Sequence, residues 1–198
     1  YTYAKSLDGA SLIDDAARDI YNLSLNKGRS GFDIRHRPVF SGTYELPGKN
    51  LFLKDWTFNG IVSYRSGFPF SVTAQGDLCN CGAAGQLAQQ IGDPRSGFTQ
   101  SRLQWFNTAA FSQSRRGAFG SSGRNILDGP GETSINLSVF RSIAIRENIK
   151  LQFRTEIFNA LNKTNFAQPN SQVGNANFGI IQSAGQGRVV QLAAKLSF

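Results

Sequence analysis

Apolar and polar side chains alternate with a period of two residues along several stretches of this chain, and this alternation limits its fold more than any other feature. The pattern is cleanest at the C-terminal end. There, one set of alternate positions is apolar throughout, namely Val190, Leu192, Ala194, Leu196 and Phe198. The positions between them are largely polar. Because successive side chains of a β-strand point to opposite faces, this segment predicts a strand with one apolar and one polar face.

Four more segments repeat the pattern, and residues 1–7 look like the end of a further strand. The four segments are 32–46, 54–73, 133–145 and 150–161. Their charged side chains fall almost entirely on the polar face, so we expect this face to meet water. Arg35, Arg37, Arg65, Arg154 and Glu156 lie on this polar face. If the strands form a barrel, these are the residues that we predict to face its interior. The patterns together predict about six strands.

Three residues break the pattern. Arg141 and His36 fall on the apolar face, but each lies near the end of its predicted strand. From there a long or amphipathic side chain can reach the edge of a membrane. Pro38 lies inside a strand, where it removes one hydrogen bond of the ladder, so we expect a β-bulge at this position.

The connections between the predicted strands alternate strictly between short and long. The short ones are 45–54, which contains Pro47-Gly48-Lys49-Asn50, and 145–150, whereas the long ones are 8–31, 74–132 and 162–187. Outer-membrane barrels have short periplasmic turns and long extracellular loops. A strand of about 11 residues tilted near 45° covers roughly 25 Å, the height of their apolar band. The sequence thus predicts an all-β fold, an antiparallel up-and-down transmembrane β-barrel segment, with ligand contacts in 74–132 and 162–187.

Aromatic residues gather near the predicted strand ends, as they do in the aromatic girdles of barrels. Those expected near the periplasmic interface are Tyr44, Phe52, Trp56 and Phe198, and those expected near the outer interface are Phe32, Phe68, Phe70 and Phe166.

Composition adds weaker constraints. The net charge of +8 fits a solvated basic surface or a polyanionic partner such as nucleic acid or lipopolysaccharide. The chain has no Met, as expected of a mature product or a fragment. Cys79 and Cys81 fit either a disulfide or two free thiols. Because His36 is the only histidine and no Gly-x-Ser-x-Gly sequence occurs, we expect no metal site, no cofactor and no enzymatic activity.

A set of short motifs carries a family resemblance. In chain order they are Phe32-Asp33-Ile34-Arg35-His36-Arg37, Tyr44-Glu45-Leu46-Pro47, Ser66-Gly67-Phe68-Pro69-Phe70, Trp105-Phe106-Asn107, Gly123-Arg124-Asn125, Leu151-Gln152-Phe153-Arg154, Glu156-Ile157-Phe158-Asn159 and Asn177-Phe178-Gly179. The ordered set, which spans essentially the whole chain, resembles the C-terminal part of the barrel of Oar-like TonB-dependent transporters.

The resemblance implies a porin-like barrel of about 22 strands in the outer membrane of a Gram-negative bacterium. It also implies an N-terminal plug with a TonB box and, upstream of it, a carboxypeptidase regulatory-like domain. The implied partners are outer-membrane lipid, lipopolysaccharide, the TonB system and the barrel assembly machinery. That machinery would read the last strand, Val190 to Phe198, as its signal. The implied function is the capture and energised transport of a large or scarce ligand.

Three alternatives stay open at the level of sequence. The chain could be a soluble β-sandwich that binds carbohydrate or mediates adhesion, a basic nucleic-acid-binding protein, or a complete small barrel of about eight strands. We expect no nucleic-acid partner, because the basic residues are spread along the chain and do not gather in one segment. The sequence also leaves transport and surface adhesion as two possible roles of a larger barrel.

Overall fold

The structure, a computed structural model, describes residues 1–11, 19, 21–48, 50, 54–82 and 86–198. These residues form an all-β fold whose regular helical structure is limited to two 3-10 turns, Leu23–Asn26 and Thr108–Ala110. Among the described residues, no helix has the length and apolar character needed to cross a membrane.

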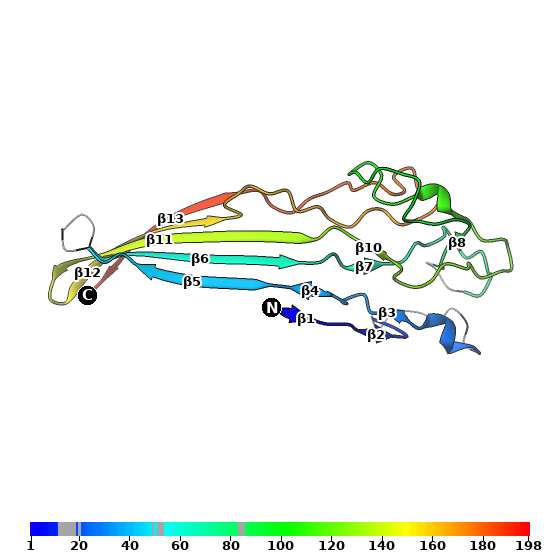
Figure 1. Cartoon of the computed structure of the whole chain (residues 1–198), viewed down its shortest axis with the longest axis horizontal. Helices are drawn as coiled ribbons and strands as arrows, with labels where there is room; N and C mark the ends of the chain where they lie inside the picture. The colour runs from blue at the N-terminus through cyan, green and yellow to red at the C-terminus, as the bar shows by residue number, and fades with distance from the viewer. Residues whose placement is uncertain (12–18, 20, 49, 51–53, 83–85) are drawn as a thin grey trace.

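Five strands form one antiparallel sheet in the order β13-β12-β11-β6-β5 (Figure 1). Their bounds are Val39–Glu45 for β5, Trp56–Arg65 for β6, Glu132–Arg146 for β11, Ile149–Phe158 for β12 and Val189–Ser197 for β13. A sixth strand, β1 (Thr2–Tyr3), pairs with β4 (His36–Arg37), which precedes β5 in the chain. Neighbours in this set are consecutive along the up-and-down path, so the prediction of about six antiparallel strands is confirmed.

The two ends of the sheet differ as the connection lengths predicted. Both short connections, β5 to β6 and β11 to β12, lie at the end that also holds the C-terminus (Figure 1). The long connections fold together at the opposite end (Figure 1). In the first short connection, residues 49 and 51–53 lie outside the described residues, and with them the predicted place of Phe52 in an aromatic girdle.

The ladder between β4–β5 and β6 shows that the bulge expected at Pro38 is wrong. Val39 pairs with Ser63, the amide of Tyr64 donates to the carbonyl of Pro38, and the amide of Ser66 donates to the carbonyl of His36. The register is therefore the same on both sides of the proline. Because a single missing N–H removes one ladder bond but does not displace the chain, the strand continues without an extra residue. In the part of the sheet that the structure describes, a register shift lies instead between Ala144 and Arg146 in β11.

The observed register sorts the side chains of the sheet into two faces. Residues that pair across an antiparallel ladder point to the same face, so one row can be followed through all five strands. The row on one face is Tyr44, Phe58, Val139, Thr155 and Leu192, and the adjacent row on the other face is Thr43, Asn59, Ser138, Glu156 and Gln191. The alternation predicted from the sequence is thus in register across all five strands, so that one of these two rows is apolar except for Thr155 and the other is polar.

The apolar face of this sheet is uncovered. Its side chains are largely exposed, up to 75% for Leu192. Among the described residues there is no second large sheet that could cover them, since the other sheets have two strands each. The alternative of a soluble β-sandwich is therefore wrong. An exposed apolar surface that extends over five strands is characteristic of a face that meets lipid.

Two short strands extend the central hairpin beyond the sheet. β7 (Pro69–Phe70) pairs with β10 (Leu127–Asp128), and the amide of Gly129 donates to the carbonyl of Phe68. These pairs keep the register of β6 with β11, in which Arg65 pairs with Glu132. By alternation, Phe70 and Leu127 lie on the side of the ladder that the apolar row occupies in the sheet.

The buried core of the molecule lies in the long connections and not in the sheet. The core side chains are Phe70, Val72, Ala88, Phe106, Ala110, Phe111, Leu127 and Val173. Phe106 lies at the centre of an aromatic cluster, with ring centroids 5.7 Å from Phe70, 5.9 Å from Phe111 and 5.3 Å from Phe178. The place predicted for Phe70 in the outer aromatic girdle is therefore wrong, because the loops cover this residue and lipid does not reach it.

Smaller pairs organise the rest of the loop end. β2 (Leu7–Asp8) pairs with β3 (Gly28–Arg29), and β8 (Gln89–Gln90) pairs with β9 (Phe111–Ser112). A disulfide joins Cys79 to Cys81, which resolves the choice that the sequence left open. The carboxylate of Asp77 accepts hydrogen bonds from the amides of Cys81 and Gly82, and these bonds lower the pKa of Asp77.

We predict that Phe106→Ala loosens the loops without unfolding the sheet. Phe106 is 2% exposed, and truncation of a buried Phe to Ala costs about 3–5 kcal/mol. Limited proteolysis of the membrane-inserted protein should cut the region 74–131 faster, while the folded barrel keeps its heat-modifiable migration on a gel. The matched control is Phe119→Ala, because Phe119 is 38% exposed in the same connection. Equal cleavage of the two variants would contradict a core centred on Phe106.

Candidate functional site

The polar face of the sheet carries a continuous set of hydrogen-bonded side chains. The hydroxyl of Thr43 donates to Asn59 Oδ1 at 2.6 Å, and Asn59 Nδ2 donates to the hydroxyl of Ser138 at 3.2 Å. These three residues come from three neighbouring strands and lie in one row of the register. Polar side chains from neighbouring strands that hydrogen-bond to one another in this way form a surface suited to contact with water.

An ion pair marks the loop end of this face. Arg65 donates to Glu132 Oε2 through Nε at 3.0 Å and through Nη2 at 2.5 Å, and its guanidinium stacks 4.4 Å from the ring centroid of Phe68. Because these two residues end β6 and begin β11, the ion pair closes the regular ladder on its polar side. The remaining nitrogen, Arg65 Nη1, is shielded from solvent and has no hydrogen-bond partner among the described residues.

A second charged group lies further along the same face. Arg154 Nη1 lies 3.6 Å from Glu156 Oε1, and the Arg154 guanidinium lies 5.5 Å from the ring centroid of Phe140. Phe140 and Ile61 share this face with them, so the face is polar on the whole but includes apolar patches. Of the five residues predicted to face the interior, Arg65, Arg154 and Glu156 therefore lie on one side of the sheet.

The other two predicted residues, Arg35 and Arg37, lie next to the loop end of the polar face. Arg37 is in β4, two residues before Val39, which pairs with Ser63 on the polar side. The unchanged register past Pro38 places Arg37 on the same side by alternation. Arg35 Nε lies 3.8 Å from Asp33 Oδ2. Arg37 therefore shares a face with Arg65, Arg154 and Glu156, whereas Arg35 lies just before β4. The exposure of the five residues to the interior of a barrel stays a prediction.

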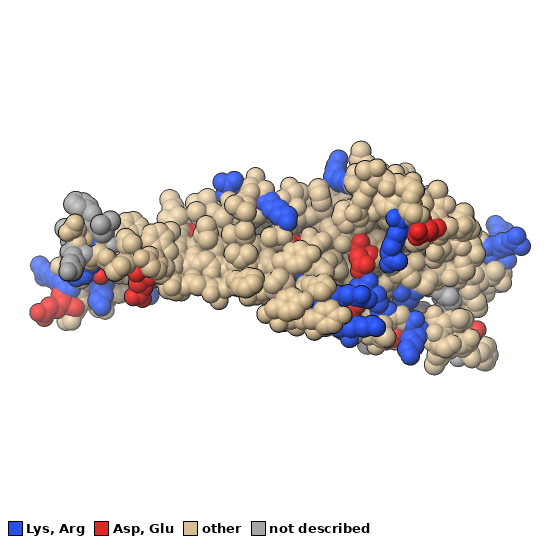
Figure 2. Space-filling view, viewed as in Figure 1, with Lys and Arg blue, Asp and Glu red and all other residues tan. Residues whose placement is uncertain are grey.

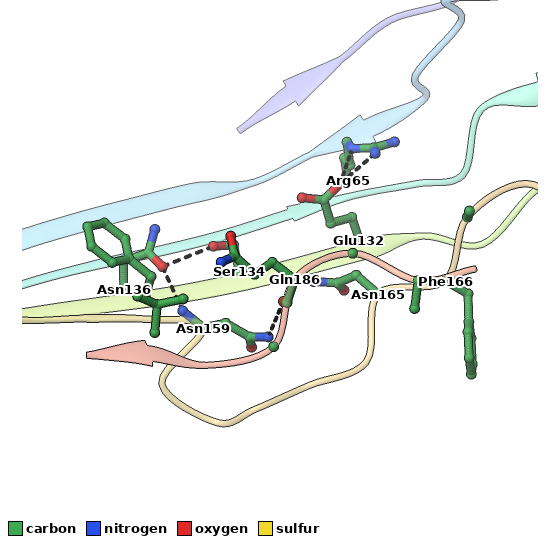
Figure 3. A pocket seen from close by; sticks show the side chains of 14 residues that line it. Arg65, Glu132, Ser134, Asn136, Asn159, Asn165, Phe166 and Gln186 are labelled. Atoms are coloured by element: carbon green, nitrogen blue, oxygen red, sulfur yellow. Dashed lines mark hydrogen bonds and ion pairs between the residues drawn. The ribbon is translucent and has the colours of Figure 1, made fainter. Parts of the chain in front are cut away.

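A cavity of about 570 Å³ lies on the polar face where the sheet meets the loops (Figure 3). The Arg65–Glu132 ion pair, Ser134 and Asn136 form its floor from the strands. The returning part of the last long connection, 184–187, and the turn after β12 form its walls. Figure 3 shows that Phe166 points away from the other labelled side chains. Phe158, Phe166 and Val189 line the cavity beside the polar groups, so its wall is mixed in character.

Asparagine side chains shape this cavity by replacing backbone pairing where β12 ends. Asn165 accepts a hydrogen bond from the amide of Thr133 and donates to the carbonyl of the same residue. Asn159 has a positive φ of 50°, which asparagine tolerates better than most residues, and its Nδ2 donates to the carbonyl of Gln186. Asn136 Oδ1 accepts from the amide of Asn159. The side chains of these asparagines thus connect the end of the β11–β12 ladder to the returning loop.

A buried ion-pair network ties the N-terminal segment to the long connection after β6. Arg29 donates to Asp33 Oδ2 at 2.8 Å and to Asp128 Oδ1 at 2.5 Å, and Asp33 also accepts from the amide of Ser6 at 2.8 Å. Arg124 pairs with Asp8 nearby. Burial alone would raise the pKa of Asp33, but the hydrogen bonds from Arg29 and Ser6 outweigh it and lower the pKa. Asp33 is 1% exposed, so its charge depends on these partners.

The predicted assembly strand is the outermost strand of the sheet. β13 pairs with β12 on one side, from Val189 opposite Phe158 to Ser197 opposite Lys150, and no described residue pairs with its other edge. The apolar positions Val190, Leu192, Ala194 and Leu196 share the exposed apolar face, and Phe198 follows the strand at the short-turn end. Recognition of this strand by an assembly machinery stays a prediction.

Arg141 and His36, the two exceptions on the apolar face, have aromatic neighbours. Arg141 pairs with Trp56 at the first position of β6, and its guanidinium lies 5.6 Å from the Trp56 ring centroid. His36 pairs with Tyr3, and its Nδ1 lies 2.8 Å from the hydroxyl of Tyr1. The two groups lie near opposite ends of the apolar face, as amphipathic side chains at the two edges of a membrane would.

Sequence reasoning missed the asparagines that shape the cavity and the buried Asp33. Asn159 and Asn165 follow a predicted strand closely, and an Asn-rich segment after a strand is the signal that could have indicated an irregular strand end. Asp33 shares the strand alternation with Arg35 and gives no local sign of burial. Its partner Ser6 lies 27 residues earlier, and its partner Arg29 also binds Asp128 from a distant segment, so only the folded chain brings these groups together.

An open antiparallel sheet with one bare apolar face, one polar face and long loops at a single end defines a class, the walls of membrane-spanning β-barrels. The family comparison agrees, because a model described as an outer membrane beta barrel domain matches residues 1–191. The chain belongs to this family, and its place is the outer membrane. No curated protein and no solved structure matches the chain.

We predict that Asp33→Asn detaches the N-terminal segment from the loops. Loss of one partner of a buried ion pair costs about 3–5 kcal/mol, so hydrogen exchange at the Ser6 amide should accelerate about 100-fold or more. The control is Asp93→Asn in an exposed loop, which should leave the exchange at Ser6 unchanged.

The pH dependence follows from the lowered pKa of Asp33. A carboxylate whose folded pKa is depressed contributes its full stability above the unfolded value of about 3.9, and it loses this contribution as the pH falls through the folded value. The difference between wild type and Asp33→Asn should therefore be constant near neutral pH and shrink only below about pH 4. A difference that already shrinks between pH 6 and 8 would contradict the assignment to Asp33.

Proposed function

We propose that the chain is the C-terminal part of a TonB-dependent outer-membrane receptor or transporter, in which it provides barrel wall and ligand-contacting loops. One observation carries the proposal. The polar face of the membrane-spanning sheet leads directly into a cavity of about 570 Å³, which lies under loops that have a packed core of their own. A barrel that only anchors a protein in the membrane has no need of a cavity on its interior face.

The packed core favours ligand capture by the loops. Loops that must bind a scarce ligand tightly lose less entropy when they are already ordered before binding. Phe106 and its neighbours order the connection between β6 and β11, and Val173 ties the last long connection to the same core. The two loops in which the sequence predicted ligand contacts thereby form one preorganised unit.

The size of the sheet favours a barrel much larger than this chain. Five strands and the short β1 cannot close on themselves, and β13 has an edge that needs a partner in the membrane. In a closed barrel of about 22 strands the lumen is wide enough to hold a plug. In this arrangement Arg35, Arg37, Arg65, Arg154 and Glu156 line the lumen or contact the plug, and lipid and lipopolysaccharide surround the apolar face.

The proposal makes a prediction about the complete gene product. The coding sequence upstream of Tyr1 should encode about 16 further alternating strands and a plug with a TonB box. The full-length protein, purified in detergent, should bind the purified periplasmic domain of TonB. Deletion of the box should abolish this binding and leave the heat-modifiable barrel intact. A complete gene product without a plug, or a full-length protein that does not bind TonB, would contradict the transporter proposal and favour surface adhesion.

A further inference from the structure

Another cavity, of about 320 Å³, is formed by β10 and the long connection that precedes it. Its lining has an apolar part, Pro94, Phe98, Trp105, Phe106 and Leu127, and a polar part, Arg95, Gln100 and Asp128. We call it the aromatic cavity, and it shares no lining residue with the 570 Å³ cavity on the polar face of the sheet. Small-ligand sites have volumes of about 300–1,000 Å³, so the aromatic cavity suits a ligand of about one ring.

The aromatic cavity has no net charge, because its charged lining consists of one arginine and one aspartate. Asp128 Oδ1 lies 2.5 Å from Arg29 Nη1. The amide of Arg95 donates to Asp93 Oδ1 at 2.9 Å, and this bond lowers the pKa of Asp93, so that the carboxylate stays ionised close to Arg95. Figure 2 shows basic and acidic side chains next to one another at the long-loop end. The cavity therefore favours a neutral ligand over an ion.

Hydrogen bonds fix the wall of the aromatic cavity. Asn107 Nδ2 donates to the carbonyl of Asp93 at 3.1 Å and to the carbonyl of Ser96 at 3.0 Å. Trp105 Nε1 donates to the carbonyl of Asp128 at 2.8 Å, which ties the connection to β10. Because this segment is ordered by its own bonds, a ligand that binds there loses little free energy to the ordering of the site.

The aromatic rings set the shape of the ligand face that can bind. Phe98 and Trp105 are partly buried and pack against the core that contains Phe106 and Leu127. The face of an aromatic ring is flat and carries partial negative charge, so it attracts the weakly positive C–H groups of a flat ligand. The apolar part of the lining thus favours a ring with C–H groups on one face.

The polar part of the lining offers both acceptors and donors. Gln100 Nε2 donates to the carbonyl of Trp105 at 3.1 Å, and Arg95 Nη2 donates to the carbonyl of Ile126 at 2.6 Å. Within the part of the chain that the structure describes, Gln100 Oε1 and Asp128 Oδ2 accept no hydrogen bond. An anion needs donors only and an ammonium group needs acceptors only, whereas a hydroxyl group uses both. A ligand with several hydroxyl groups therefore fits this set best.

We propose that the aromatic cavity binds a neutral sugar ring, with a C–H face against Phe98 and Trp105 and the hydroxyl groups toward Arg95, Gln100 and Asp128. A sugar ring combines these features, since it has C–H groups on its faces and hydroxyl groups around its edge. The inference goes beyond the transporter proposal, because a barrel that serves adhesion could carry the same site. The sugar could belong to a soluble glycan or to the saccharide core of lipopolysaccharide around the barrel.

The experiment uses the full-length protein in a detergent that has no sugar headgroup. Methyl glycosides of glucose, galactose and mannose are titrated, and saturation-transfer NMR measures the dissociation constant and identifies the ring protons that contact the protein. At least one glycoside should bind, with the protons of one ring face saturated most. Phe98→Leu keeps an apolar side chain but removes the ring, and Gln100→Ala removes an acceptor, so each should weaken binding about three- to tenfold.

The matched controls are Phe119→Leu and Gln75→Ala. Both residues are exposed, lie in the same connection and do not line the cavity, so these variants should bind as wild type does. Phe98→Tyr keeps the aromatic face and should retain most of the binding. Limited proteolysis of the connection verifies that each variant keeps its core. Failure of all three glycosides to bind the wild type, or wild-type affinity of folded Phe98→Leu and Gln100→Ala, would overturn the proposal.

A second arm separates the two sources of the sugar. The protein is reconstituted in lipid nanodiscs that contain either lipopolysaccharide with its saccharide core or lipid A alone, and the glycoside that binds in detergent is titrated again. Weaker binding in the presence of the core supports the site with a lipopolysaccharide sugar as its occupant, because the core competes for the cavity. Equal, Phe98-dependent binding in both nanodiscs supports a soluble glycan. Neither arm depends on TonB, so the sugar site and the transporter proposal can fail separately.

Discussion

The structure depends on the requirement that every backbone N–H and C=O in hydrocarbon has a partner. In a membrane, β-strands meet this requirement only through unbroken ladders to both neighbours. Within the described sheet the three inner strands, β12, β11 and β6, have ladders on both sides, and even Pro38 does not displace the ladder of β5 with β6. Once the backbone is fixed in this way, the side chains can only alternate between two faces. The composition of each face then decides what it meets: lipid on the side of Leu192 and Phe58, water on the side of Asn59 and Ser138.

The same constraint explains how the sheet passes into the loops. The central hairpin keeps its register from Trp56 opposite Arg141 to Phe70 opposite Leu127. Its apolar stripe therefore continues beyond the membrane, where no lipid can cover it. The loops take over this role, since Phe106 and Phe111 pack on Phe70 and Leu127 in a common core. The same row of alternate apolar side chains thus contacts lipid within the sheet and loop side chains beyond it. The packing against the loop side chains orders the loops.

Loop order in turn produces the cavities. The polar face receives the end of β12 and the returning last loop, whose asparagines keep the cavity above Arg65 and Glu132 open. The N-terminal segment is held against the loops by the bonds of Arg29 to Asp33 and Asp128, and a second, smaller cavity lined by Arg29, Arg35 and Arg95 lies there. The aromatic cavity adjoins it, since Arg95 and Asp128 line both. These cavities lie at the long-loop end, where a ligand from outside the cell would arrive first if the barrel has the orientation that its connection lengths indicate.

Much of the sheet was predictable from the sequence because alternation is a local property. The strands around Phe58, Val139 and Leu192 reveal their two faces within a few residues, and short and long connections distinguish the two ends. The loop core was not predictable, since Val72, Phe106 and Val173 are far apart in the chain and lie in segments rich in polar residues. Phe70 shows this limit. The sequence placed it on the correct face of the strand, but only the tertiary structure decides whether loop residues or lipid cover it. The bulge at Pro38 was wrong because a missing donor does not by itself change the register.

The most direct test of the two-faced wall is a scan of β13 with nitroxide spin labels, one at a time from 189 to 197, in the full-length protein in lipid bilayers. Collision rates with oxygen, which concentrates in lipid, and with a water-soluble nickel complex should alternate with a period of two. Labels at Leu192 and Ala194 should favour oxygen, whereas labels at Gln191 and Lys195 should favour the nickel complex. If Leu192 and Gln191 both respond mainly to the nickel complex, the apolar face of this sheet does not meet lipid, and the account of the chain as a barrel wall is wrong.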